Sequence, residues 1–224
     1  MTCLIFRKGI GMKIDYVVWD FNGTILDDVE TGIRSVNRLL LDRNLRPIAS
    51  KEEYREIFGF PIMRYYERLG FDFSKEPYEV IAPLWVEQYL KNVKEAEAFS
   101  DVKQTLEAFR ERGIRQAVLS ATEKGMLEKQ LTDLGLLDYF DEIWGLDNIH
   151  AASKTALAKS FREKHLHDKM IYLGDTDHDV ESARAMGADC YLIARGHQSE
   201  ARLRRLGVPM FPDLTSFYET VLKE

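Results

Sequence analysis

Cysteine is scarce in this chain of 224 residues, with Cys3 and Cys190 as its two thiols. Two cysteines so far apart form neither a disulfide framework nor a zinc knuckle, which excludes a small stapled domain. Scarce thiols are typical of a reduced, cytoplasmic protein, and we expect that location. The chain is long enough to bury a core that needs no cross-link.

Long apolar runs are also lacking. None approaches the ~20 residues of a membrane-spanning helix, so we expect no membrane partner. The apolar stretch near the N-terminus, residues 4–6, is too short for the core of a signal peptide. Met12 begins a second plausible start, and we expect residues 1–12 to form a poorly ordered extension.

A basic excess is absent as well. The chain carries 31 Lys and Arg against 37 Asp and Glu, a formal net charge of −6. A nucleic-acid binder would normally show a basic excess or a basic face, so we expect no nucleic-acid partner. A phosphate ligand remains compatible with this charge, because a metal ion and a few well-placed donors can dominate locally.

The first element is an apolar, β-rich run over residues 14–19, which predicts a buried strand ending at Asp20. Residues 29–98 have apolar spacing typical of helices, interrupted by Pro47, Pro61 and Pro77. From about residue 100, strands and helices alternate. We expect strands at 115–120, 141–146, 170–175, 189–194 and 207–211, and helices at 102–112, 124–135, 154–165, 180–186 and 216–223.

This alternation predicts an α/β fold with a doubly wound, parallel-sheet (Rossmann-like) core. The core would comprise residues 13–28 and 99–224, with residues 29–98 inserted as a helical domain after the first strand. Such an insert lies at the carboxyl edge of the sheet, where open α/β sheets bind their ligands.

Three of the predicted strands end in polar side chains. Asp20 follows the first strand in D-F-N-G-T, Ser120 ends the second in V-L-S-A-T, and Asp175 follows a later one in L-G-D-T-D-H-D. Lys154 begins a helix between the last two. Because the carboxyl ends of parallel strands meet at one edge, we expect these side chains to converge.

These residue types suit phosphoryl transfer. A carboxylate such as Asp20 can attack phosphorus and form an aspartyl-phosphate. Crowding Asp20, Asp175 and Asp179 together demands a cation, and Mg²⁺ fits because it prefers carboxylate, phosphate and water oxygens. Lys154 can neutralise phosphate charge. Phosphoryl transfer needs little beyond placement and charge stabilisation.

Small residues near the first two strand ends are candidates for phosphate contacts. Ser120, followed by Ala121, can donate a hydrogen bond to a phosphate oxygen. Gly23 and Thr24 follow the candidate nucleophile, and their backbone N–H groups could cradle the phosphate.

The order of these motifs resembles that of the haloacid dehalogenase (HAD) superfamily, and the predicted insert is similar to the helical cap of its phosphoglycolate phosphatase-like subgroup. The resemblance implies that Asp20 is the nucleophile and that Asp175 binds the metal with support from Asp179. It also implies that the backbone carbonyl of Asn22 is a metal ligand.

The chain departs from the family at Asn22, where phosphatases of this kind usually carry a second Asp that protonates the leaving alkoxide and then activates water. Asn cannot transfer a proton in this way. General acid–base help is typically worth about 10²–10⁴ in rate. We therefore predict slow turnover of alkyl phosphates and a smaller penalty for aryl and acyl phosphates, so Asn22→Asp should favour the alkyl substrate.

The function expected from the sequence is a Mg²⁺-dependent phosphatase of a small phosphorylated metabolite, acting as a monomer or homodimer. Two alternatives stay open: a phosphate-binding regulatory protein with little turnover, and a phosphotransferase or mutase. A two-component receiver domain is disfavoured, because such domains are about half this length.

Other side chains have simpler interpretations. Thr122 is expected to cap or solvate, Arg64 to be a solvated surface residue and His178 to be a bystander near the site. The aromatic residues of the insert have the helical spacing of a packed core rather than of a substrate-binding box. They are Tyr54, Phe58, Tyr65, Tyr66, Trp85 and Tyr89.

Overall fold

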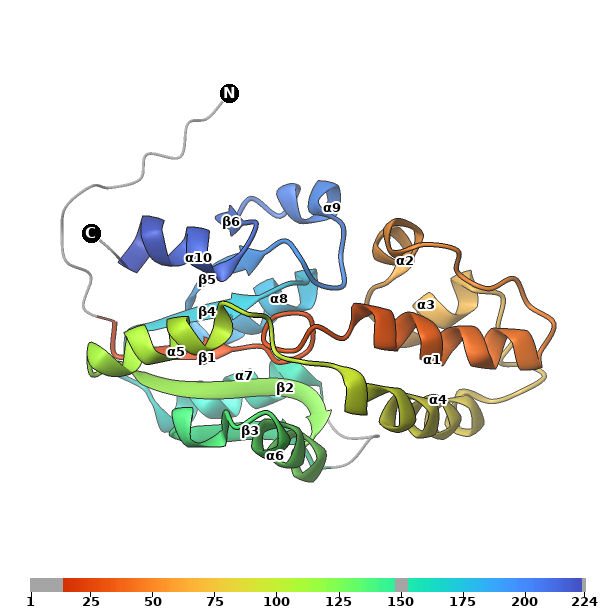
Figure 1. Cartoon of the computed structure of the whole chain (residues 1–224), viewed down its shortest axis with the longest axis horizontal. Helices are drawn as coiled ribbons and strands as arrows, with labels where there is room; N and C mark the ends of the chain where they lie inside the picture. The colour runs from red at the N-terminus through yellow and green to blue at the C-terminus, as the bar shows by residue number, and fades with distance from the viewer. Residues whose placement is uncertain (1–13, 148–152, 223–224) are drawn as a thin grey trace.

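The computed structural model describes residues 14–147 and 153–222, so the N-terminal extension expected at residues 1–12 lies outside the described residues. The chain forms two lobes, a sheet-containing core and a helical lobe beside it (Figure 1). No helix of the described part combines the length and the apolar character that crossing a membrane requires.

The core is built on a six-stranded sheet with the order β3-β2-β1-β4-β5-β6, and each neighbouring pair is parallel. β1 is central, with Trp19 aligned to Val118 on one side and to Leu173 on the other. The strands are β1 (Tyr16–Trp19), β2 (Arg115–Glu123), β3 (Glu142–Leu146), β4 (Met170–Gly174), β5 (Asp189–Ile193) and β6 (Met210–Phe211). The predicted doubly wound fold is confirmed.

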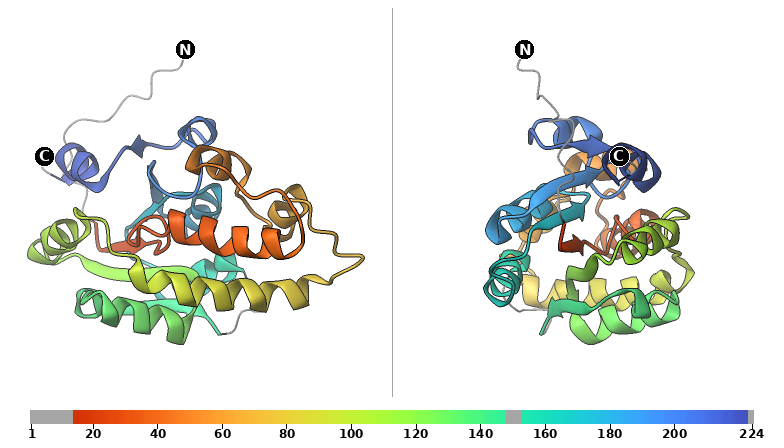
Figure 2. Two further views of the ribbon diagram at one scale, coloured as in Figure 1. Left: turned by 45° about the vertical axis from the view of Figure 1, so that its right-hand side comes forward. Right: turned by 90° about the vertical axis from the view of Figure 1, so that its left-hand side faces the viewer.

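Helices cover both faces of the sheet, as the two views of Figure 2 show. Alternate side chains of β1 feed the two layers: Val17 and Trp19 pack on one side, and Tyr16 and Val18 on the other. The first layer contains α5 (Val102–Glu111), α6 (Lys124–Asp133) and α10 (Leu214–Phe217), and the second contains α7 (Lys154–Lys164), α8 (Asp177–Met186) and α9 (Glu200–Arg204). This double burial explains why β1 is apolar throughout.

The insertion after β1 forms the second lobe, called the helical lobe below and taken as residues 29–98. It contains α1 (Val29–Asp42), α2 (Lys51–Ile57), α3 (Ile62–Arg68), α4 (Tyr78–Asn92) and a 3₁₀ turn, η1 (Val93–Glu95). The Ser50 side chain caps α2, and Pro61 and Pro77 directly precede α3 and α4. The lobe has a hydrophobic cluster of its own, which includes Val36 and Ile81.

The chain passes between the lobes twice, and the two crossings are paired. The N–H of Asp27 donates to the carbonyl of Glu97 at 2.9 Å, and the N–H of Phe99 donates to the carbonyl of Ile25 at 3.0 Å. These bonds fix the lobe's base beside the carboxyl end of β1.

Some element limits differ from the sequence prediction. β2 runs on to Glu123, and α8 begins at Asp177 because Thr176 and Asp179 form a capping box there. The Ser199-capped helix α9 was not predicted, since five residues are too few to show a periodicity. The last helical segment starts at residue 214 and continues as a π-helical turn to residue 222.

Candidate functional site

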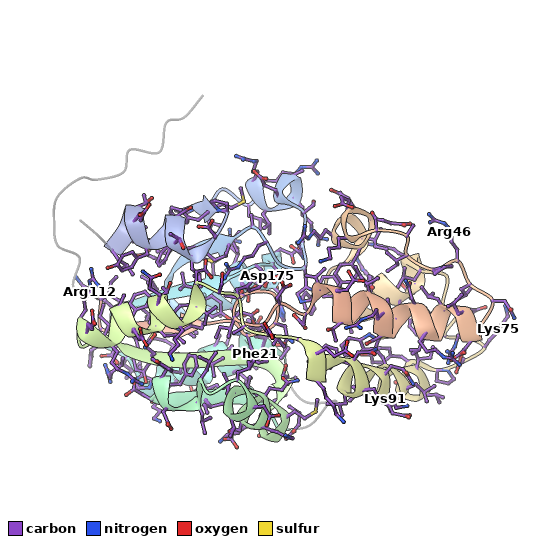
Figure 3. All side chains as sticks on the ribbon, viewed as in Figure 1. Phe21, Arg46, Lys75, Lys91, Arg112 and Asp175 are labelled. Carbon is purple, nitrogen blue, oxygen red and sulfur yellow. The ribbon has the colours of Figure 1, made fainter. Side chains whose placement is uncertain are left out.

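Three buried carboxylates meet at the carboxyl edge of the sheet. Asp20 follows β1, Asp175 follows β4, and Asp179 lies in the first turn of α8. One oxygen from each lies within 4.8 Å of the other two. Asp175 lies centrally, where the core meets the helical lobe (Figure 3). The fold thus brings together three acids that lie up to about 160 residues apart in sequence.

Lys154 at the start of α7 joins the acids. Its ammonium group is buried and donates to Oδ1 of Asp20 and, at 2.5 Å, to Oδ1 of Asp179. Lys154 is therefore not a solvated helix residue, and its charge is shared between two carboxylates.

The electrostatics of this cluster leave negative charge uncompensated. Burial raises the pKa of Asp20 well above its usual range, and the charges of Asp179 and Asp175 add to the rise, although Lys154 opposes it. Burial likewise raises the pKa of Asp175 to about 6. Three carboxylates against one ammonium group form a site that a hard divalent cation fits, because such ions select clustered carboxylate oxygens.

Asp179 is the most tightly held of the three acids. Its Oδ2 accepts from the backbone N–H groups of Asp175 and Thr176, at 3.0 and 2.8 Å, and from the Thr176 hydroxyl at 2.7 Å. Burial alone would raise the pKa of Asp179, but Lys154 and these donors hold it below its usual value. With both oxygens committed, Asp179 orients Lys154 and the turn that carries Asp175.

The loop after β1 approaches Asp175 closely. Gly23 has φ of 74°, and a Cβ there would collide with Oδ2 of Asp175 and lie 2.6 Å from Cδ2 of His197. Its N–H donates to the carbonyl of Leu26 and to Oδ1 of Asp28, both at 2.9 Å. The backbone N–H of Gly23 is thus already occupied, which argues against the phosphate-cradling role expected for it.

Other expected phosphate contacts are partly engaged too. The N–H of Thr24 donates to the carbonyl of Phe21 at 3.4 Å, and its hydroxyl donates to Oδ1 of Asp175 at 3.3 Å. The buried Ser120 hydroxyl donates to the Thr122 hydroxyl at 3.1 Å. Ser120 and Ala121 both line the cavity described below, which leaves them in reach of a ligand.

The Asn22 side chain is fully hydrogen-bonded. Its Nδ2 donates to Oδ2 of Asp28 and to the Tyr89 hydroxyl, both at 2.8 Å, and its Oδ1 accepts from the Thr122 hydroxyl at 2.9 Å. Thr122 therefore positions Asn22 and does more than cap or solvate. An amide suits this place because it donates to Asp28, which a carboxylate could not do without a proton.

A buried His–Asp pair beside the acids was missed by sequence reasoning. Nε2 of His197 lies 3.1 Å from Oδ1 of Asp28, and Nδ1 lies 2.8 Å from the Tyr54 hydroxyl. Burial lowers the pKa of His197, but the charge of Asp28 and the hydrogen bond to it outweigh this and raise it to about 9. The available signal was position: His197 follows the strand β5 at the same edge as Asp175.

A cavity of 330 Å³ lies over the acids, between the core and the helical lobe. Asp20, Asp175, Lys154 and His197 line it from the core. The aromatic residues that were expected to pack do pack, and they also line this cavity: Tyr54, Phe58, Tyr65, Tyr66, Trp85 and Tyr89. His178 lines it as well, whereas Arg64 is exposed as expected.

Comparison with known proteins assigns the chain to a family. A model described as haloacid dehalogenase-like hydrolase matches residues 17–193. This chain belongs to that family. The match spans the buried acids from Asp20 to Asp179 and the whole helical lobe, so the family prediction from sequence is confirmed.

Several curated relatives cover most of the chain. A phosphoglycolate phosphatase from Aquifex aeolicus is 26% identical over 191 residues, covering 81% of this chain and 85% of the relative. The tyrosine-protein kinase PtkA from Mycobacterium tuberculosis is 24% identical over 190 residues, covering 84% of this chain and 64% of that protein.

Solved structures show the same fold. A haloacid dehalogenase-like family hydrolase from Streptococcus pneumoniae superposes with a TM-score of 0.74 at 19% identity, covering 88% of this chain and 92% of the other. The structure of M. tuberculosis protein tyrosine kinase A gives a TM-score of 0.77 at 19% identity, covering 93% and 98%. At this identity the likeness shows the fold alone.

Proposed function

We propose that this protein is a Mg²⁺-dependent phosphatase of small phosphorylated molecules that uses Asp20 as a covalent nucleophile. The observation that carries the proposal is the buried cluster in which Asp20, Asp175 and Asp179 meet around Lys154. Membership of a hydrolase family and the phosphatase named among the relatives support it.

In this proposal each residue has a separate task. An oxygen of Asp20 attacks phosphorus, the ester P–O bond breaks, and water then hydrolyses the aspartyl-phosphate to release inorganic phosphate. Lys154 neutralises charge on the phosphoryl group. Asp20, Asp175 and the backbone carbonyl of Asn22 would hold Mg²⁺, which would supply the positive charge that lets an anionic phosphate approach a carboxylate.

The helical lobe would act as a cap over this chemistry. It supplies the outer wall of the cavity, and closure there would exclude water from the phosphoryl group. In this proposal residues 29–98 form the cap domain, and residues 13–28 and 99–224 form the catalytic core.

The test is phosphate release with Mg²⁺ from a panel of phosphate monoesters. Asp20→Asn should reduce the rate by at least about 10⁴-fold, since removing a nucleophile removes the chemical step. Asp27→Asn is the matched control, because Asp27 is an exposed acid a few residues away. Equal activity of Asp20→Asn and wild type would overturn the proposal, and chelation of Mg²⁺ should mimic the Asp20 change.

A phosphotransferase is the second candidate, and Asn22 favours it. Without a proton-accepting group at this position, the aspartyl-phosphate should persist, which gives an acceptor other than water time to react. The kinase named among the relatives supports this alternative. Products formed in the presence of added sugars, nucleosides or tyrosine peptides separate the two: free phosphate indicates a phosphatase, and a phosphorylated acceptor indicates a transferase.

A binding protein without turnover is the remaining alternative. It would bind phosphate esters with Mg²⁺ and release no phosphate from any of them, in wild type as in Asp20→Asn.

A further inference from the structure

The helical lobe contributes an uncharged wall to the cavity. All residues of this lobe are described, and each one that lines the cavity is aromatic, aliphatic or glycine. The rings of Trp85 and Tyr89 stack with centroids 4.9 Å apart, and those of Tyr54 and Phe58 stack at 5.2 Å. A flat apolar group is the ligand that such stacked rings contact best.

Two of the tyrosine hydroxyls of this wall are bound to the core, whereas the buried hydroxyl of Tyr65 has no hydrogen-bond partner in the described part of the chain. The hydroxyl of Tyr54 lies 2.8 Å from Nδ1 of His197, and that of Tyr89 donates to Oδ2 of Asp28 at 2.8 Å. Because these hydroxyls are satisfied within the protein, the rings are what Tyr54 and Tyr89 offer to a ligand.

Arg55 of the lobe reaches the core, but its guanidinium donates to the carbonyls of Arg195 and Gly196 and it does not line the cavity. Three other basic side chains of the lobe lie away from the site. Arg46, Lys75 and Lys91 stand at the outer edge of the helical lobe, whereas Asp175 lies at the centre of the molecule (Figure 3). Each of the three basic residues pairs with an acid of the lobe's own surface, and all are largely exposed. They are therefore not placed to bind an anionic group in the cavity.

Within the described ranges, Lys154 is the one Lys or Arg that lines the cavity, and it is already paired with Asp20 and Asp179. Nε2 of His197 faces Asp28, and the His178 ring lies against Phe60, with ring centroids 4.4 Å apart. A substrate with a carboxylate on its alcohol portion would bury that charge without a partner, which is strongly unfavourable.

The chemistry at position 22 independently favours an aromatic leaving group. Asn22 cannot protonate a leaving group, and its amide is engaged by Asp28, Tyr89 and Thr122. A phenol has a pKa of about 10, as in a tyrosine side chain, whereas an ordinary alcohol is nearly as weak an acid as water, at about 15.7. Phenolate can therefore leave without the help that Asn22 cannot give.

Resting on the proposed function, we infer that the substrate is a small aryl phosphate whose neutral aromatic ring occupies the cavity. The volume of 330 Å³ is at the small end of ligand pockets, which fits one ring and a phosphate group. An oxygen of Asp20 bonds to phosphorus, and the bond to the aryl oxygen breaks with its electron pair. The phenolate takes a proton from water, and a second water releases phosphate from Asp20.

A matched set of three substrates tests the inference: phenyl phosphate, benzyl phosphate and 2-phosphoglycolate, each with Mg²⁺. Phenyl phosphate should exceed 2-phosphoglycolate in kcat/KM by at least about a hundredfold, which is the scale of discrimination by an apolar pocket. Benzyl phosphate has the ring but an alkyl leaving oxygen, so it should bind Asp20→Asn as tightly as phenyl phosphate does, while its kcat/KM with wild type falls. A higher kcat/KM for 2-phosphoglycolate than for phenyl phosphate overturns the inference.

A variant that adds charge to the wall sharpens this test. Val86 of α4 lines the cavity and is half-buried. Val86→Lys should raise KM for phenyl phosphate and lower KM for 2-phosphoglycolate by about tenfold each, since it supplies the missing cation. Val86→Met is the control for size. The ratio of KM for phenyl phosphate to KM for 2-phosphoglycolate should be higher in Val86→Lys than in Val86→Met. An unchanged ratio in Val86→Lys means that the ring site lies elsewhere and contradicts the inference.

Binding to Asp20→Asn separates this inference from the proposed function. Trp85 lines the cavity, so its fluorescence should respond to phenyl phosphate added with Mg²⁺, and Trp85→Phe should remove the response. If nothing is turned over but phenyl phosphate binds at least about tenfold more tightly than 2-phosphoglycolate, the aryl site stands and the phosphatase proposal fails. If phosphate is released while 2-phosphoglycolate binds more tightly, the phosphatase stands and the aryl site fails.

Discussion

The core and the helical lobe line one cavity with opposite chemistry. The core presents buried charges, Asp20, Asp175 and Lys154, held by backbone and side-chain hydrogen bonds. The lobe presents stacked rings such as Trp85 and Tyr89. In the proposed function this difference corresponds to a division of labour, in which the core would bind phosphate and metal and the lobe would select the group that carries the phosphate.

The two regions also differ in how their cavity residues are stabilised. The core's charges depend on each other, so removing one leaves another buried without a partner. The rings of the lobe are stabilised by the area that they bury against one another. Removing one ring loses packing but leaves no charge unpaired. The predictions below test this contrast from the largest expected effect to the smallest.

Of these variants, Lys154→Met should have the largest effect on activity, because it leaves the carboxylates of Asp20 and Asp179 without their ammonium partner. Phosphate release should fall by more than about 10³-fold, the scale of losing one electrostatic stabiliser. The free energy of unfolding, measured by urea titration without Mg²⁺, should fall by about 3 kcal/mol. Lys159→Met, at an exposed position of the same helix, is the control and should match wild type.

Phe161→Ala should destabilise the core without touching the site. The Phe161 ring is fully buried, with Tyr16 edge-on at 5.2 Å and Trp144 at 5.5 Å. The free energy of unfolding should fall by about 4 kcal/mol, as for other buried aromatic truncations. The half-buried Trp85 is the matched ring in the lobe, and Trp85→Ala should cost less stability but raise KM for an aryl phosphate. A larger loss of unfolding free energy for Trp85→Ala than for Phe161→Ala would contradict the view that the lobe ring contributes less to stability than the core ring.

Exchanging the amide and the carboxylate tests the Asn22–Asp28 pair. In Asn22→Asp alone, a second carboxylate would stand 2.8 Å from Oδ2 of Asp28, which repels it. We therefore expect a gain on alkyl phosphates of about 10²-fold in the double variant Asn22→Asp/Asp28→Asn, and little gain in the single one.

Rates on benzyl and phenyl phosphate measure the effect of this exchange. The gain in the first step, measured as release of the alcohol or phenol within a single turnover, should be confined to the benzyl ester, because the phenol needs no proton. Hydrolysis of the intermediate should become faster for both esters. An equal gain on both esters in this first step would show that position 22 acts through structure and not through protonation of the leaving group.

Tyr54→Phe should have the smallest effect. It removes one hydrogen bond, from the lobe to His197 of the core, and leaves the ring in place. The free energy of unfolding should fall by about 1 kcal/mol. Tyr78→Phe is the comparison, because Tyr78 also lines the cavity and is only partly buried, and it should cost less. A larger loss of unfolding free energy in Tyr78→Phe would show that the hydrogen bond between Tyr54 and His197 does not stabilise the contact between the lobe and the core.

Much of the core could be predicted from sequence because its signals are local. The apolar run that ends at Asp20, and the later run that ends at Asp175, place both acids at strand ends, and parallel pairing then brings them to one edge. Lys154 was found in the same way, as the first residue of a helix between strands.

The remainder of the site depends on contacts that no local pattern reports. Asp28 and His197 lie 169 residues apart and meet only once the lobe's base and the loop after β5 are in place. Helical spacing identified Tyr54 and Tyr89 as packed residues, but it cannot show that a packed ring also borders a cavity. The hydrogen bond from the Gly23 N–H to Asp28 was also not predictable, because it depends on the conformation of the loop after β1.

The most direct test of the account is to quench the reaction of wild-type protein with phenyl phosphate and Mg²⁺ within a single turnover and to find the phosphoryl group by peptide mass spectrometry. Because an amide cannot activate water, we expect slow hydrolysis of the intermediate, so the phosphoryl group should accumulate on the peptide that contains Asp20, and on its carboxylate. Phosphate released at the same rate with no phosphoryl group on Asp20, or with one on another residue, would contradict the account.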